Sequence, residues 1–297
     1  MFIKSKEINI GSLEAEEEIS KKSKMYLDEV FYDLIDIDNF FEKESKFLLV
    51  GGKGSGKSAC ARVYRKRALG SYNKFCQIFT KSELNFEKVI QEIPASSNNL
   101  TPRELKKFLI EWLLLNQLLE LLKRHEFVKS LKEYEKLEYY HTINRGIVSI
   151  NERDLIESIK QFSGEVNVDP LNSFVKANFG KSNTFKFKKA FFAQVIPDLK
   201  NTIKILLENV NGYASKETYY FTLVLDDLDH DLRNSEDDRD FLMDMLRITK
   251  DYNINFIDYD KVSFKIVLLL RPDILSELKS YSDSFKLIES YKTRCVN

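Results

Sequence analysis

A glycine-rich run near residue 50 constrains this chain more than any other feature. Residues 51–58 read Gly-Gly-Lys-Gly-Ser-Gly-Lys-Ser and fit G-x-x-x-x-G-K-[ST], the pattern of a phosphate-binding loop, or P-loop. The mostly apolar residues 46–50 predict a short buried strand before it, and residues 58–68 predict a helix after it that stops at Gly70. This order of strand, glycine loop and helix is the context that the motif requires, and it predicts an α/β fold.

The residue types of this run suit the binding of phosphate. Glycines let successive backbone N–H groups point at phosphate oxygens, and the helix N-terminus adds partial positive charge. Lys57 is expected to reach the β- and γ-phosphates of a nucleotide, and Ser58 to place its hydroxyl on Mg²⁺. The expected cofactor-binding residues are Gly52, Lys53, Gly54, Ser55, Gly56, Lys57, Ser58 and Ala59. The alternative is a glycine-rich turn that carries a surface lysine.

A second candidate strand ends in acidic residues. Residues 219–225 are almost wholly aromatic and aliphatic, as in a parallel strand buried on both faces, and Asp226, Asp227 and Asp229 follow them. Because open α/β sheets bind ligands at the carboxyl ends of their strands, Asp226 is expected to hold Mg²⁺, directly or through water. Asp227 is expected to orient or activate an attacking water. The alternative is that these acids cap the following helix, as Asp229 in particular could do.

Together these two motifs resemble those of the additional-strand (ASCE) P-loop ATPases, most of all the KAP and STAND-like branch. That branch carries a doubled acid and a further acid after the second strand. By general layout the chain also resembles predicted bacterial P-loop ATPases linked to phage defence. The resemblance covers about residues 25–90 and 190–297. It implies a P-loop NTPase three-layer sandwich with a mostly parallel sheet, which binds and hydrolyses ATP with Mg²⁺.

The resemblance also gives a role to a third apolar run. Residues 262–270 would be the sensor strand, placed between the P-loop strand and the strand that ends at Asp226. Arg271 follows this run, where its guanidinium could contact the γ-phosphate as a catalytic group. The alternative is a surface arginine before a proline that starts the next helix.

Missing motifs disfavour two other P-loop classes. Signalling GTPases use D-x-x-G after the second strand, whereas residues 226–229 read Asp-Asp-Leu-Asp, and the guanine-reading N-K-x-D is absent. A Ser- and Gly-rich signature of the ABC type is also absent. ATP is therefore preferred over GTP by elimination.

Charge and apolar patterning divide the chain into four expected parts. They are an N-terminal arm (1–24), the P-loop half of an ATPase core (25–100), a mainly helical insertion with a hairpin (101–190) and the second half of the core (191–297). Thr101-Pro102-Arg103-Glu104 predicts the start of a long helix that runs to about His125. Its leucines would be buried in the insertion or would form a coiled-coil or dimer surface.

The end of the chain carries one further expectation. In the resembled ATPases a last core strand is followed by a helical lid, and residues 292–297 would begin or form that strand. No residues then remain for the lid, so the chain is expected to be a fragment or a reduced family member.

Composition bounds the partners. Lys plus Arg and Asp plus Glu number 46 each, so the net charge is zero and does not support a nucleic-acid partner. Residues 168–189 interleave Phe with Lys, a pattern that suits either the binding of single-stranded nucleic acid or an amphipathic strand with its lysines exposed to solvent. The three cysteines are too scattered for a disulfide framework or metal site and predict reduced thiols in a cytoplasmic protein. No signal peptide or apolar run of ~20 residues is present, which predicts no membrane partner.

These expectations converge on an ATP-binding and ATP-hydrolysing switch or assembly module. Its partner would be a second copy of the chain in a homo-oligomer or an effector protein or domain, and the resemblance extends the role to antiviral defence. Two alternatives stay open: a nucleotide-gated scaffold with little turnover, and a nucleic-acid-dependent ATPase. A measurement of ATP turnover distinguishes the ATPase from the scaffold. Salt-sensitive DNA binding would identify the nucleic-acid-dependent ATPase.

Overall fold

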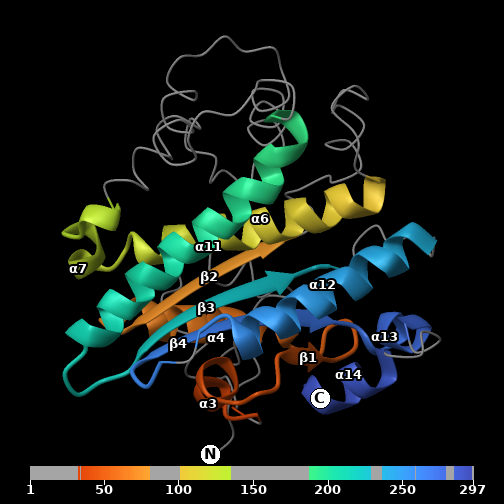
Figure 1. Ribbon diagram of the computed structural model, residues 1–297. Coiled ribbons are helices and arrows are strands. Elements are labelled where there is room, and N and C mark those ends of the chain that lie inside the picture. The colour runs from red at the N-terminus through yellow and green to blue at the C-terminus, as the bar shows by residue number, and fades with distance from the viewer. Residues whose placement is uncertain are drawn as a thin grey trace, which may run out of the picture.

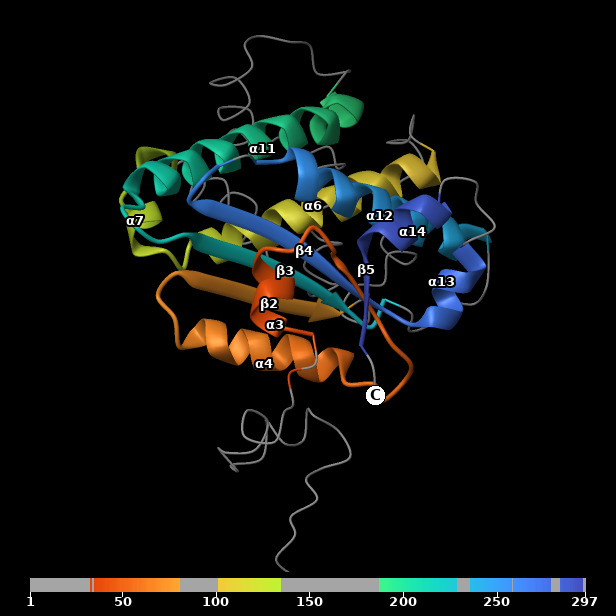
Figure 2. The same cartoon turned by 90° about the horizontal axis from the view of Figure 1, so that it is seen from below.

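The computed structural model describes residues 33, 35–80, 101–134, 187–228, 236–257, 259–278 and 284–295. Within these ranges, five strands form one parallel sheet in the order β2-β3-β4-β1-β5; β1 is labelled in Figure 1 and β5 in Figure 2. The strands are β1 (Leu48–Val50), β2 (Lys74–Thr80), β3 (Tyr219–Asp226), β4 (Val262–Leu270) and β5 (Lys292–Arg294). Since all the pairings are parallel, every strand ends at the same edge of the sheet. The expected α/β fold with a parallel sheet is confirmed.

The strand positions follow the apolar runs closely. β4 has the predicted limits, and it lies between β1 and β3 as the family resemblance implied. β5 pairs with β1, with Leu48 opposite Lys292, so a last strand does form near the end of the chain. The strand predicted at residues 46–50 was too long, because regular pairing begins at Leu48.

Helices cover both faces of this sheet (Figures 1 and 2). On one face lie α3 (Ile37–Glu42) and α4 (Lys57–Leu69). The other face carries α6 (Pro102–Leu122), α11 (Phe187–Tyr213) and α12 (Glu236–Asn255). Three short helices complete the described part: α7 (Glu126–Lys129), α13 (Pro272–Leu278) and α14 (Ser284–Tyr291). The sheet is therefore the middle of three layers.

Neighbouring residues of one strand supply two separate cores. Val224 packs with apolar residues of α3 and α4, whereas Leu223 and Leu225 pack with those of α6, α11 and α12. Successive side chains of a strand point to opposite faces, so a wholly apolar run is stable only when both faces are covered. Residues 221–225 are buried as predicted, whereas Tyr219 and Tyr220 at the start of the strand are half-buried.

The leucine-rich helix α6 is a layer of the main core. Its first turn has the predicted capping box: Glu104 N–H donates to Thr101 Oγ1 (3.3 Å), and Thr101 N–H donates to Glu104 Oε2 (2.7 Å). The leucines from Leu109 to Leu122 are buried in the same cluster as β3 and β4. They therefore pack against the sheet instead of forming a coiled-coil surface, and the helix ends at Leu122, before the predicted His125.

Several expectations fall on other parts of the chain. The arm at residues 1–24 and most of the Phe/Lys segment lie outside the described residues. Residues 187–189, at the end of that segment, belong to α11 and do not extend a hairpin strand. The proposed domain boundaries at 101 and 190 stay predictions.

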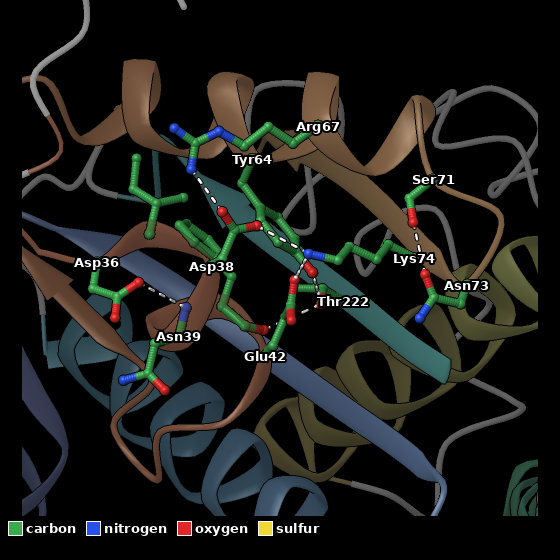
Figure 3. Close-up of polar contacts among 12 residues, drawn as sticks. Asp36, Asp38, Asn39, Glu42, Tyr64, Arg67, Ser71, Asn73, Lys74 and Thr222 are labelled. Carbon is green, nitrogen blue, oxygen red and sulfur yellow. Dashed lines mark hydrogen bonds and ion pairs between the residues drawn. The ribbon is translucent and has the colours of Figure 1, made fainter. Parts of the chain in front are cut away.

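A polar network fixes the helix that follows the glycine-rich loop (Figure 3). Arg67 of α4 contacts Asp38 of α3 (2.7 Å), and Lys74 of β2 contacts both Asp38 (3.1 Å) and Glu42 (2.5 Å). Although burial acts to raise the pKa of Asp38, the hydrogen bonds from Lys74 and Arg67 hold it below its ordinary value. The network therefore joins the last turn of α4 to α3, and α3 to β2.

None of the helices in the described ranges is both long and apolar enough to span a bilayer.

Candidate functional site

The glycine-rich loop joins the carboxyl end of β1 to the start of α4. Gly51 N–H donates to the carbonyl of Leu270, the last residue of β4 (3.2 Å), and Ser55 N–H donates to Gly52 O (3.2 Å). Gly54 and Gly56 have φ values of 78° and 86°, in the left-handed region that glycine adopts without steric cost. The backbone thus curls as the sequence motif predicted.

The first glycine of the run is required for packing. A Cβ atom at Gly51 would lie 2.2 Å from Ser55 Oγ, 3.0 Å from Ser55 Cβ and 3.2 Å from Cys295 Cβ, so Ser55 would have to shift to admit a side chain there. A Cβ atom at Gly52, Gly54 or Gly56 would meet no other atom within 4 Å. The glycines at 54 and 56 are therefore explained by their conformation, and the space beside them is open to a ligand.

The start of α4 can accept an anion. Its N-cap is Gly56, and no side chain caps it. Backbone N–H groups in a first helical turn have no partner within the helix, and they attract phosphate or carboxylate. Ser58 and Ala59, both half-buried, lie in this turn.

Lys57 brings a positive charge to the same loop. Its Nζ donates to the carbonyl of Gly51 (2.8 Å) and to that of Gly52 (3.0 Å). The ammonium group is thus held over the loop by two neutral acceptors. A charged phosphate oxygen makes a stronger hydrogen bond with an ammonium than a carbonyl does, so an anion could displace these contacts.

The predicted acids lie at the same edge of the sheet. Asp226 is the last residue of β3, and its Oδ1 accepts a hydrogen bond from Asp227 N–H (2.8 Å). One strand, β4, separates β3 from β1, so the axes of β3 and β1 are ~10 Å apart. Asp227 has φ 56°, a strained value for a residue with a side chain, and the next residue, Leu228, is buried. Asp229 lies outside the described residues.

Arg271 follows β4 directly, beside the start of the loop. Its Nη2 forms an ion pair with Asp273 Oδ2 (2.7 Å), and Pro272 begins α13. Arg271 thus precedes a helix that starts with proline, as one interpretation predicted, and it follows β4 at the edge of the sheet that carries the loop; its contact with a γ-phosphate stays a prediction. The ion pair is exposed on both sides, and such pairs are weak enough to exchange partners.

The available oxygen ligands suit Mg²⁺ bound together with phosphate. In the described part of the chain, no three His, Cys, Asp or Glu side chains gather as a metal site. Ser58 and Asp226 would be the protein ligands, from α4 and from the end of β3. Magnesium often takes only one or two protein ligands and completes its shell with water and phosphate oxygens. The residues present therefore fit the ion.

Sequence reasoning missed a pair of thiols beside the loop. Cys60 of α4 and Cys295, just after β5, have their sulfur atoms 3.9 Å apart. The hydrogen bond with Cys60, helped by Lys57 and Ser55, lowers the pKa of Cys295 to about 7 against the effect of burial. These cysteines are 235 residues apart in the chain, so no local spacing could have indicated their contact.

Comparisons with models of protein families, with curated proteins and with solved structures found no match for this chain. Its function is therefore inferred from the geometry of the loop and the strand ends.

Proposed function

We propose that this chain binds ATP with Mg²⁺ at the glycine-rich loop and hydrolyses the β–γ phosphoanhydride bond. The observation that carries the proposal is the loop itself, with Gly54 and Gly56 in the left-handed region and Lys57 above it. It lies at the edge of a parallel sheet where a second strand ends in Asp226 and Asp227. A glycine-rich turn that served only as a connection would not require a lysine over the loop and two acids at the same edge of the sheet.

Each residue has a defined role in this proposal. Backbone N–H groups of residues 52–59, other than that of Ser55, which donates to Gly52 O, hold the phosphates, and Lys57 exchanges its carbonyl contacts for the β- and γ-phosphate oxygens. Mg²⁺, when held by Ser58 and Asp226, neutralises charge on the phosphates. Asp227 orients the attacking water, and Arg271 stabilises charge at the γ-phosphate.

The proposed biological role is that of a nucleotide-dependent switch. ATP is the preferred nucleotide because the guanine-reading motif is absent from the sequence. The proposed partner is a second copy of the chain or an effector protein in the cytoplasm, and the family resemblance extends the role to antiviral defence. A nucleic-acid partner has no support from the net charge of zero.

The direct test of binding is calorimetric titration of Lys57→Ala with ATP and Mg²⁺. Loss of a charge-assisted contact to phosphate is expected to weaken binding by roughly 10- to 100-fold. The matched control is Arg65→Ala, which removes an exposed cation from the same helix. Equal affinities of wild type and Lys57→Ala would overturn the assignment of the loop.

A second experiment separates an ATPase from a scaffold. Phosphate release is measured against chain concentration, with and without single-stranded DNA. Release that rises more than in proportion to concentration supports an oligomeric ATPase. ATP binding without release under any of these conditions supports the scaffold, and stimulation by DNA that is lost at high salt supports the nucleic-acid-dependent alternative.

A further inference from the structure

Two thiols from distant parts of the sequence meet beside the glycine-rich loop. Cys60 projects from the first turns of α4 and is 3% exposed, whereas Cys295 follows β5 and is half-buried. Both are free, with their sulfur atoms 3.9 Å apart. A disulfide has a sulfur–sulfur bond of about 2.05 Å, so the two atoms would need to approach by roughly 2 Å.

The backbone and side chain of Cys295 are both held against the loop. Its N–H donates to Val50 O (2.8 Å), and its Sγ donates to Ser55 O (3.0 Å). The hydrogen bond with Cys60 is the main cause that lowers the pKa of this thiol to about 7, and loss of its proton, which gives up the contact with Ser55 O, yields the nucleophilic thiolate. The more accessible sulfur is thus also the more reactive one, and Cys60 is placed as its partner.

We propose that Cys295 and Cys60 form a peroxide-sensitive modification site that closes to an intramolecular disulfide. The Cys295 sulfur attacks one oxygen of hydrogen peroxide, the O–O bond breaks, and a sulfenic acid and one water form. The Cys60 sulfur then attacks the Cys295 sulfur, the S–O bond breaks, and a second water leaves with the Cys60 proton. In balance, two thiols and one peroxide give one disulfide and two waters.

The third cysteine provides an internal control. Cys76 lies in β2, is 3% exposed, and burial raises its pKa to about 12. It therefore has little thiolate at neutral pH, and it takes no part in the contact between Cys60 and Cys295. A reaction that depends on the thiol pair spares this residue.

The test uses the full reduced chain, treated with one equivalent of hydrogen peroxide at pH 7, then alkylated and digested for mass spectrometry. The expected product is a cross-linked peptide that joins Cys60 to Cys295, with Cys76 alkylated. Loss of the Cys295 thiol is expected to be roughly tenfold faster than loss of the Cys76 thiol. Cross-links between chains, or equal loss of all three thiols, would overturn the proposal.

Two variants test the order of the steps. In Cys60→Ser the sulfenic acid at Cys295 has no resolving thiol and is expected to be trapped by dimedone. Cys76→Ser, the matched control, is expected to cross-link as the wild type does. If Cys60→Ser fails to fold by circular dichroism, the wild-type cross-link alone decides the matter.

Oxidation also has an expected effect on the loop, which rests on the proposed function. The disulfide removes the Cys295 thiol from Ser55 O, so the oxidised chain is expected to bind ATP with Mg²⁺ roughly fivefold more weakly. Cys295→Ser cannot cross-link, and peroxide should leave its affinity unchanged. A chain that cross-links but binds no ATP in either state contradicts the nucleotide proposal alone, whereas one that binds ATP but never cross-links contradicts the thiol pair alone.

Discussion

Asp227 adopts a backbone conformation that few residues other than glycine tolerate. Its φ of 56° lies in the left-handed region, where Asp and Asn are the least penalised residues with side chains. The turn is held by the hydrogen bond from Asp227 N–H to Asp226 and by the buried Leu228. Strain of this kind is common at functional sites, and here it falls directly after the last residue of β3.

The first prediction concerns this second carboxylate. Asp227→Asn keeps a side chain that tolerates the left-handed region, so the fold and ATP binding are expected to be retained. Hydrolysis is expected to slow by ~10²–10⁴-fold, because an amide cannot serve as the general base. Single-turnover hydrolysis of prebound ATP with Mg²⁺ measures this rate. The neighbouring variant Asp226→Asn should instead weaken the Mg²⁺ dependence of binding, and a wild-type rate in Asp227→Asn would make that residue structural.

Lys265 is a buried cation outside the candidate site. It lies in β4, is 5% exposed, and its Nζ donates to Phe40 O and lies 4.8 Å from the centre of the Phe40 ring. Burial lowers its pKa from 10.5 to about 7, although Glu44 and Glu42 act to raise it. Between pH 7 and 10.5 the unfolded chain therefore binds more protons than the folded one, so stability should rise with pH in this window.

The second prediction follows from that sign. Lys265→Met removes the charge, and the variant is expected to be more stable than wild type at pH 6–7. Its advantage should shrink by on the order of 1 kcal/mol per pH unit between pH 7 and 9. Urea unfolding of both proteins at several pH values gives the comparison, and the other titrating groups largely cancel in the difference. Parallel stability curves would show that Lys265 stays in one protonation state.

At the scale of the element, α6 shows how a local signal can fix the start of a helix. Its capping box satisfies two backbone donors that would otherwise lack partners. The third prediction is that Thr101→Ala lowers the free energy of unfolding by ~1 kcal/mol. The control Glu104→Gln keeps an acceptor for Thr101 N–H and should cost less. A Thr101→Ala protein with wild-type stability in urea would mean that packing alone holds this end of the helix.

At the scale of the whole molecule, α6 and the sheet share one core. Trp112 of α6 is buried with β3 and β4 on one face, whereas Cys76 of β2 is buried on the other face with α4. The same strands contribute side chains to both cores, so loss of the helices on one face would also weaken the packing on the other face. The two layers of helices are therefore expected to unfold together.

The fourth prediction is a single transition seen by two probes. The fluorescence of Trp112, the one tryptophan in the chain, and the reactivity of the Cys76 thiol should change at the same urea concentration. The measurement uses the Cys60→Ser, Cys295→Ser variant, so that Cys76 is the only thiol. An earlier transition at Trp112 would instead support a separate insertion beginning near residue 101.

The sequence by itself determined the elements that carry strong local patterns. The apolar runs that became β3 and β4, the glycine loop and the Thr101 cap were predictable because each depends on neighbouring residues: side-chain alternation, permitted φ values and unpaired helix donors. For the same reason the candidate residues Lys57, Asp226 and Arg271 could be named. Their meeting at one sheet edge was predictable only through the strand order that the family resemblance implied.

Only the tertiary structure decided the features that depend on contacts between distant residues. The packing of α6 on the sheet, the burial of Lys265 under α3 and the strained turn at Asp227 leave no local pattern in the sequence. The contact between Cys60 and Cys295 is the clearest case, because it forms only when β5 pairs with β1 beside the loop. Local patterns encode conformation, whereas burial and proximity arise from the packing of whole elements.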